Sequence, residues 1–144
     1  MAKKDRCFYR GNFRKDADEA ERQHKRWFVG AYLEAKPRKT ELVEIKHWKY
    51  ERGARPHDIK TSCTIECTLI LCGKITGMVA GRDITLSGGD YVVIAPGTPN
   101  ALPQKVLEDV EGVTIKAPSI PVAKHIKVKL RRGGWRFRVE LCKR

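Results

Sequence analysis

A hydroxyl-rich segment that contains one carboxylate is the part of the sequence best suited to chemistry. Residues 61–72 are mostly β-branched or apolar, which is typical of a β-strand. Strand alternation places the following side chains on one face: Ser62, Thr64, Glu66, Thr68 and Ile70. Buried hydroxyls need hydrogen-bond partners, so this face suits an interior that holds water or a polar ligand. The alternative is that it packs on a neighbouring sheet and its hydroxyls bond to the backbone.

Three cysteines in the same segment are candidates for a metal site. Cys63 and Cys67 share a strand face, but residues four apart in a strand have Cα atoms about 13 Å apart, which is too far for one ion. Cys72 has the opposite parity. We therefore expect these cysteines to be small buried hydrophobic residues. Five irregularly spaced cysteines also do not form the pattern of a disulfide framework.

The positive charge of the chain is concentrated towards its two ends. The 144 residues carry a net charge of +13 and are 41% hydrophobic, which is enough for one domain with a core. The net charge is +6 over residues 1–52, −1 over 53–116 and +8 over 117–144. Nucleic acid is therefore a candidate partner for the flanks only. Without a signal sequence or an apolar run near the ~20 residues that cross a bilayer, we expect a cytoplasmic protein without membrane contact.

Short strands separated by turns dominate the middle of the chain. Strand-like patterns at 27–29, 41–50, 61–72, 75–79, 82–86, 91–95 and 113–116 are separated by Gly, Pro and Asp. This spacing predicts an all-β sandwich or barrel. Before it, residues 16–26 are good helix formers with acids first and bases last, which predicts a short helix or arm.

The last segment predicts an amphipathic hairpin. Residues 125–131 and 135–141 alternate between apolar and polar, and Gly133-Gly134 is a turn signal. Its basic face, a candidate contact for a polyanion, consists of Lys127, Lys129, Arg131, Arg136 and Arg138. A solvated face that discourages aggregation is the alternative. The apolar face must pack on the barrel or on another subunit, because a lone hairpin is marginally stable.

From residue 53 to residue 100 the sequence resembles the cupins. In the first cupin motif a Glu is followed by six residues and a Gly, as Glu66 and Gly73 are here. The second motif runs Gly-Asp, a short apolar strand, Pro-x-Gly, two residues and a His, and residues 89–100 follow it up to Asn100. The resemblance covers about residues 27–119 and implies a jelly roll, or double-stranded β-helix. We predict an N-terminal arm at 1–26, an all-β cupin-like jelly-roll barrel at 27–120 and the hairpin at 121–144.

The resemblance also implies where a metal would bind, and there the chain departs from the family. Cupins have a His-x-His pair at the place of residues 59–62, which here read Ile-Lys-Thr-Ser, and Asn100 replaces the last His. The remaining candidate ligands are Glu66, in register, and His57, a few residues early. Transition-metal sites need three or four converging donors. We therefore expect no metal and no other cofactor.

Polar and aromatic residues gather at the expected mouth of the barrel: Trp48, Tyr50, Arg55, His57, Lys60 and Asn100. Together with Ser62, Thr64 and Glu66 they form the predicted ligand-binding set. Cations beside aromatic rings suit a phosphorylated, base-bearing or carboxylated ligand. The alternative for each residue is an ordinary solvated rim.

These observations favour a non-catalytic cupin-like protein that binds or sequesters a small anionic ligand, such as a nucleotide or a phosphorylated sugar. A cupin enzyme is the first alternative: a metal-dependent dioxygenase or isomerase, or a metal-free epimerase with His47 or His57 as its base. A nucleic-acid-binding protein that uses the basic flanks is the second. Because cupins commonly pair through strands, we expect a homodimer or a larger cyclic homo-oligomer.

Overall fold

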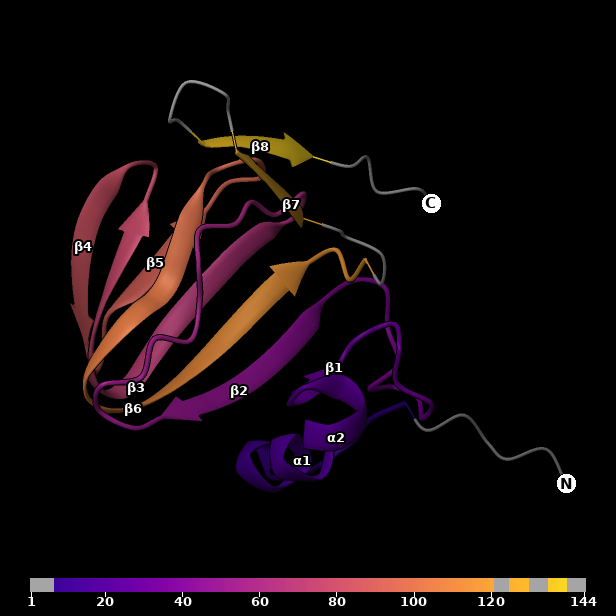
Figure 1. Ribbon diagram of the computed structural model, residues 1–144. Coiled ribbons are helices and arrows are strands. Elements are labelled where there is room, and N and C mark those ends of the chain that lie inside the picture. Colours follow the sequence, from indigo (N-terminus) through magenta and orange to yellow (C-terminus); the bar gives the residue numbers. More distant parts are fainter. Residues whose placement is uncertain (1–6, 121–124, 130–134, 140–144) are drawn as a thin grey trace, which may run out of the picture.

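The computed structural model of the protein describes residues 7–120, 125–129 and 135–139 (Figure 1). Two short helices, α1 (Phe13–Glu19) and α2 (Glu21–His24), come first. The strands that follow are β1 (Trp27–Val29), β2 (Glu44–Tyr50), β3 (Ile65–Val79), β4 (Arg82–Ser87), β5 (Tyr91–Ile94), β6 (Asn100–Ala117), β7 (His125–Lys129) and β8 (Trp135–Val139). The described part is therefore mostly β, with a short helical segment before the first strand.

One antiparallel sheet contains the first six strands. Its order is β1-β2-β6-β3-β4, and β5 also pairs with β3. The two halves of β3 have different neighbours, because residues 66–69 pair with β5 and residues 74–79 pair with β4. In Figure 1 the sheet curls, with β4 at one end and the helices beside β1 and β2 at the other. This curvature gives the sheet an inner and an outer face.

The inner face changes from polar to apolar along the strands. Directly opposite residues of antiparallel strands point to the same face. One cross-strand row consists of Glu44, Lys116, Glu66 and Ile94. The next row consists of Lys46, Thr114, Thr68 and Val92. The third consists of Trp48, Gly112 and Ile70. Charged groups thus occupy one end of the interior, and the hydrophobic core begins further along each strand.

Trp48 starts that core. Its side chain is 3% exposed and packs with the buried residues Ile70, Ile75, Ile94, Leu102, Val106 and Val110. Gly112, directly opposite on β6, leaves the space for it, because a Cβ at position 112 would overlap the indole ring. The indole Nε1 donates a hydrogen bond to Thr114 Oγ1 at 2.9 Å, so the polar atom of the ring is satisfied.

The boundaries of three elements differ from the sequence predictions. The helix begins at Phe13 rather than near residue 16, because the Asn12 side chain accepts hydrogen bonds from the amides of Arg14 and Lys15 at 3.1 Å each. Gly73 does not end a strand: it has φ +84° inside β3, where a side chain would strike the Asp109 carbonyl. Residues 100–117 form one continuous strand, although only residues 106–107 and 113–116 within it have strand-like patterns.

The C-terminal strands form a separate sheet, in which β7 pairs with β8 in antiparallel fashion. Arg131 lies outside the described residues, and so do the side chains of Lys127, Lys129, Arg136 and Arg138. Their contact with a polyanion stays a prediction, as does the division of the chain at residues 26 and 120. No helix within the described ranges is long and apolar enough to cross a membrane.

Candidate functional site

The hydroxyl-rich face predicted around Glu66 is buried. Ser62 and Thr64 are each 4% exposed, and Glu66, Thr68 and Ile70 are still less exposed. The alternate side chains from Ser62 to Ile70 therefore point into the interior, as the sequence predicts. Glu66 lies at the centre of this buried row, which makes it the reference point of the candidate site.

Most of the buried hydroxyls bond to one another. Ser62 Oγ lies 2.9 Å from Thr64 Oγ1, and Thr68 Oγ1 lies 3.2 Å from Thr114 Oγ1. Other buried atoms of this region have no hydrogen-bond partner among the described residues: Thr61 Oγ1, Glu66 Oε2 and Asn100 Oδ1. Such atoms cost free energy unless water or a ligand satisfies them. The interior therefore holds unused hydrogen-bonding capacity at its polar end.

Three lysines, here called the lysine cluster, gather at that end: Lys46, Lys60 and Lys116. Lys60 Nζ lies 3.9 Å from Glu66 Oε1, and Lys116 Nζ lies 3.6 Å from Glu66 Oε2. Lys46 Nζ and Lys116 Nζ lie 5.8 and 5.5 Å from the centre of the Trp27 ring. Strands β2 and β6 and the loop before β3 thus contribute three lysines: Lys60 and Lys116 face Glu66, and Lys46 and Lys116 face Trp27.

Burial and mutual repulsion act on the charges of the lysine cluster. Burial, reinforced by the positive charges of Lys60 and Lys116, lowers the pKa of Lys46 to about 8. Burial also lowers the pKa of Lys60, although the charge of Glu66 opposes this shift. His57 is subject to the same effects: burial first, then Lys60 and Lys46, lower its pKa to about 4. At neutral pH the imidazole of His57 is therefore uncharged, and the positive charge of the site belongs to the lysines.

Glu44 stands in the same cross-strand row as Lys116 and Glu66. Its Oε2 accepts a hydrogen bond from Ser119 Oγ at 3.0 Å. Burial raises the pKa of this carboxyl, and the hydrogen bond from Ser119 partly opposes that rise. Burial therefore makes the negative charge of Glu44 less favourable than that of an exposed carboxylate.

The structure brings together only part of the predicted ligand-binding set. Lys60 and Asn100 are joined by two backbone hydrogen bonds, of 2.7 and 2.8 Å, and the Lys60 side chain reaches Glu66. The rings of Tyr50 and His57 meet edge to face with centroids 6.3 Å apart. Trp48 lies in the core rather than at a mouth, and Arg55 is exposed in the loop before β3.

Sequence reasoning missed Lys46, Lys116 and Trp27. Lys46 has the same parity as Trp48 and Tyr50, and Lys116 has the same parity as Thr114, so strand alternation alone could have placed each on the inner face. Their meeting depends on the register of β2 against β6, in which Glu44 faces Lys116 and Lys46 faces Thr114. No local pattern specifies that register.

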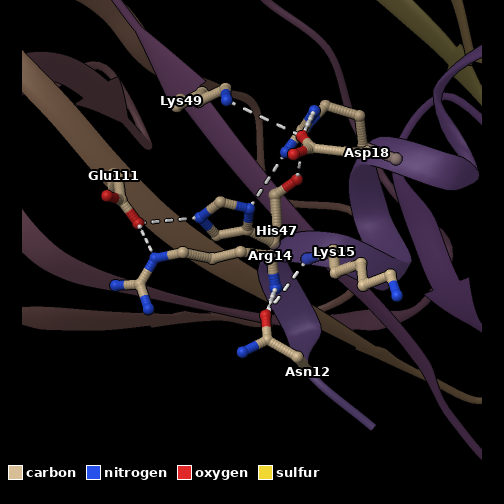
Figure 2. Close-up of polar contacts among 8 residues, drawn as sticks. Asn12, Arg14, Lys15, Asp18, His47, Lys49 and Glu111 are labelled. Atoms are coloured by element: carbon tan, nitrogen blue, oxygen red, sulfur yellow. Dashed lines mark hydrogen bonds and ion pairs between the residues drawn. The ribbon is translucent and has the colours of Figure 1, made fainter.

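His47 lies on the other face of β2, under α1 (Figure 2). Its Nε2 is 3.0 Å from Glu111 Oε2, and its Nδ1 is 3.1 Å from Arg26 Nη2. Because the Arg26 guanidinium can only donate hydrogen bonds, the Nδ1 atom of His47 accepts one from it. The Nε2 atom therefore carries the ring proton and donates a hydrogen bond to Glu111. The ring of Phe13 covers the imidazole at 5.2 Å. His47 therefore fastens the helices to the sheet and cannot act as a base in the interior.

The residues around Glu66 do not fit a metal ion. The described part of the chain contains no group of three or more His, Cys, Asp or Glu side chains that could hold one. The two oxygens of Glu66 face the ammonium groups of Lys60 and Lys116 instead. A metal cation at this carboxylate would be repelled by the lysine cluster. His57 and Glu66 therefore do not form half of a metal site here.

The cysteines differ from the prediction that all three would be small buried hydrophobic residues. Cys72 is exposed and Cys67 is only half-buried. Cys63 is disulfide-bonded, which the irregular spacing of the cysteines did not predict. Cys67 points to the outer face of β3 because it has the opposite parity to Glu66.

Comparison with solved structures shows a cupin fold. An RmlC-like cupin from Shewanella frigidimarina matches with a TM-score of 0.50 and 13% identity, over 56% of this chain and 70% of that one. A conserved protein of unknown function from Streptococcus pyogenes matches with a TM-score of 0.48 and 16% identity, over 53% of this chain and 64% of that one. A salicylate 1,2-dioxygenase from Pseudaminobacter salicylatoxidans matches with a TM-score of 0.49 and 10% identity, over 54% of this chain and 21% of that one.

No family model and no curated protein matches the sequence. The match to the RmlC-like cupin nevertheless shows an RmlC-like cupin fold, as the resemblance at Glu66–Gly73 and residues 89–100 predicts. Its residues at the position of the usual cupin metal differ in chemistry from a metal site.

Proposed function

We propose that this cupin-fold protein binds a small anionic ligand at the lysine cluster and does not convert it. The observation that carries the proposal is the imbalance of charge at the polar end of the interior. Lys60 and Lys116 face Glu66 and Lys46 stands one row away, so three lysines meet two carboxyls, and burial raises the pKa of the second carboxyl, Glu44. An anion would restore the balance.

The geometry of the ion pairs leaves N–H donors of the lysines unused. Lys60 and Lys116 lie 3.9 and 3.6 Å from the Glu66 oxygens, which is longer than a charge-assisted hydrogen bond. Each ammonium has three N–H donors, and one carboxylate oxygen can use only part of them. Phosphate or carboxylate oxygens would take the remaining donors, and the amide of Asn100 offers an acceptor for a ligand hydroxyl or amine.

The half-buried indole of Trp27 adds an apolar surface beside the cations. A base or a sugar ring could lie against this surface while a phosphate meets the ammonium groups. This combination supports a nucleotide or a phosphorylated sugar as the ligand class.

A thermal-shift panel tests the proposal. The panel contains inorganic phosphate, pyrophosphate, mono- and cyclic nucleotides and sugar phosphates. A ligand present at 100-fold its Kd stabilises the fold by about 2.7 kcal/mol. We expect at least one stabilising anion, whose effect is lost in Lys116→Gln and kept in Lys49→Gln. Lys49 is a matched control, because it lies on β2 but its side chain is exposed on the outer face. Absence of any stabilising anion would contradict the proposal.

The same material separates the alternative functions. Turnover of a sugar phosphate from the panel would indicate an enzyme that uses neutral His57 as its base. Tight, salt-sensitive binding of RNA or DNA without any effect of the small anions would indicate a nucleic-acid-binding protein.

We also propose that a second copy of the chain pairs with the open edge of β5. Among the described strands β5 pairs only with β3, so its other edge is open. Its outward side chains Tyr91 and Val93 are 67% and 53% exposed, and Ile65 on β3 is 44% exposed. An open edge with apolar side chains is a site for strand pairing between molecules. This supports a homodimer or a larger cyclic oligomer.

A further inference from the structure

Lys46 differs from the other two members of the lysine cluster in its partners. Lys60 and Lys116 each form an ion pair with Glu66. Within the described ranges, no acidic side chain lies at ion-pair distance from Lys46, whose closest aromatic contact is the Trp27 ring at 5.8 Å. Lys46 is therefore the member of the lysine cluster without a carboxylate partner. Like Lys116 it lies next to the Trp27 ring, and it stands on the inner side of the sheet, one row from Lys116.

A lysine in this setting is a nucleophile. Burial and the positive charges of Lys60, Lys116, Arg26 and Lys25 disfavour its ammonium form, so the free amine is available at a pH at which surface lysines are protonated. With a pKa of about 8, Lys46 is the neutral amine in a substantial fraction of molecules near that pH. An ordinary lysine of pKa ~10.4 is under ~1% neutral there.

We propose that Lys46 captures an anionic carbonyl compound, such as a 2-oxo acid or a phosphorylated aldehyde or ketone, as an imine within the lysine cluster. This inference rests on the proposed function, since Lys60 and Lys116 must hold the carboxylate or phosphate that brings the carbonyl to Lys46. Substrate anchored in this way reacts at a high effective concentration.

The reaction balances without an oxidant or a reductant. The neutral Nζ of Lys46 attacks the carbonyl carbon; the carbonyl oxygen takes up one proton and the nitrogen loses one, which gives a neutral carbinolamine. The proton that left the nitrogen then returns to the hydroxyl, which departs as water while the nitrogen lone pair forms the C=N bond of a protonated imine. The ammonium of Lys60, which acts electrostatically on Lys46, is a proton donor for the oxygen, and neutral His57 is an acceptor for the nitrogen proton.

Reductive trapping tests the inference. The full chain is treated with glyoxylate and cyanoborohydride at about pH 8, and the adduct is located by peptide mass mapping. We expect one dominant adduct, at Lys46, formed at least about tenfold faster than at Lys49, with a rate that levels off near pH 8 rather than above pH 10. Lys46→Arg should lose the adduct, and Lys49→Arg should keep it. Circular dichroism and melting temperature establish that both variants are folded.

Two results would overturn the imine: labelling spread evenly over Lys49 and other exposed lysines, or an unchanged adduct yield in folded Lys46→Arg. A second carbonyl, neutral acetaldehyde, separates this inference from the proposed function. Preferential labelling of Lys46 by glyoxylate, together with protection of Lys46 by pyrophosphate, supports both the imine and the anion site. Selective Lys46 labelling by acetaldehyde and glyoxylate alike, without protection, supports the amine and contradicts the anion site. A thermal shift with pyrophosphate but no selective labelling leaves the anion site and refutes the imine.

Discussion

Replacing Glu66 by Gln should destabilise the fold and strengthen anion binding at the same time. Glu66 is buried and faces the ammonium groups of Lys60 and Lys116 at 3.9 and 3.6 Å. With an effective dielectric constant of about 20, each pair is worth roughly 4 kcal/mol of Coulomb energy before desolvation is subtracted. Removing one partner of a buried pair costs about 3–5 kcal/mol. The side chains of Lys60 and Lys116 are still 26% and 15% exposed, so water will recover part of this loss. We expect a net loss of about 2–3 kcal/mol.

Anion affinity should change in the opposite direction. Glu66 competes with any ligand anion for the donors of Lys60 and Lys116, and the neutral amide introduced by Glu66→Gln would compete less. Pyrophosphate should therefore raise the melting temperature of Glu66→Gln by more than it raises that of the wild type. Unfolding by urea gives the free energy of unfolding in the absence of ligand. Thermal melts at increasing pyrophosphate concentration give the rise in melting temperature caused by the anion.

Glu108→Gln is the matched control, because Glu108 is an exposed carboxylate on β6. It should change the free energy of unfolding by less than about 0.5 kcal/mol and leave the response to pyrophosphate unchanged. The reasoning is refuted if Glu66→Gln behaves like this control. It is equally refuted if Glu66→Gln is destabilised and its response to pyrophosphate weakens, since Glu66 would then help to bind the anion instead of competing with it.

Three further predictions concern pH, packing and association. Burial and the neighbouring lysines lower the pKa of His57 to about 4, from a value near 6.5 in the unfolded chain, so its contribution to stability is complete above pH 6.5 and is lost as the pH falls towards 4. Urea unfolding as a function of pH should show this loss, and His57→Gln should reduce it; an unaltered pH profile would contradict the assignment. Gly112→Ala should lower the free energy of unfolding by about 1–3 kcal/mol, because the added methyl group overlaps the Trp48 ring; an unchanged free energy of unfolding in urea would contradict this packing. Val93→Lys should lower the mass measured under native conditions if the β5 edge forms the oligomer, whereas an exchange at exposed Leu42 should not; an unchanged mass for Val93→Lys would refute this interface.

The inner face of β3 could be predicted from the sequence because strand alternation is local. Once Glu66 is assigned to a strand, the orientation of Ser62, Thr64, Thr68 and Ile70 follows from the period of two. The cupin fold could likewise be predicted, because the spacing of Gly, Asp and Pro at residues 89–97 reflects turns that need those residues. Gly89 and Gly97 both have positive φ in the structure.

The members of the site that were missed depend on pairing between distant strands. Lys46 and Lys116 are 70 positions apart in sequence and become neighbours only through the register of β2 against β6. Trp48 was assigned to a mouth because an aromatic ring near cations suggests a ligand, whereas its place in the core depends on the absence of a side chain at Gly112. A glycine such as Gly112 predicts the position of a large side chain only when the residue opposite it on the neighbouring strand is known.

The row of Glu44, Lys116 and Glu66 bears also on how the chain finds its register. Negative, positive and negative groups stand side by side on three adjacent strands. If β6 slipped by one residue, Lys116 would turn to the outer face and Ile115 would take its place, leaving both carboxyls in the interior without the cation between them. Such a mispaired sheet would be penalised by several kcal/mol. The charges that we assign to ligand binding thus also discriminate against misfolded alignments, and a substitution at Lys116 is expected to affect the yield of correctly folded protein as well as its affinity.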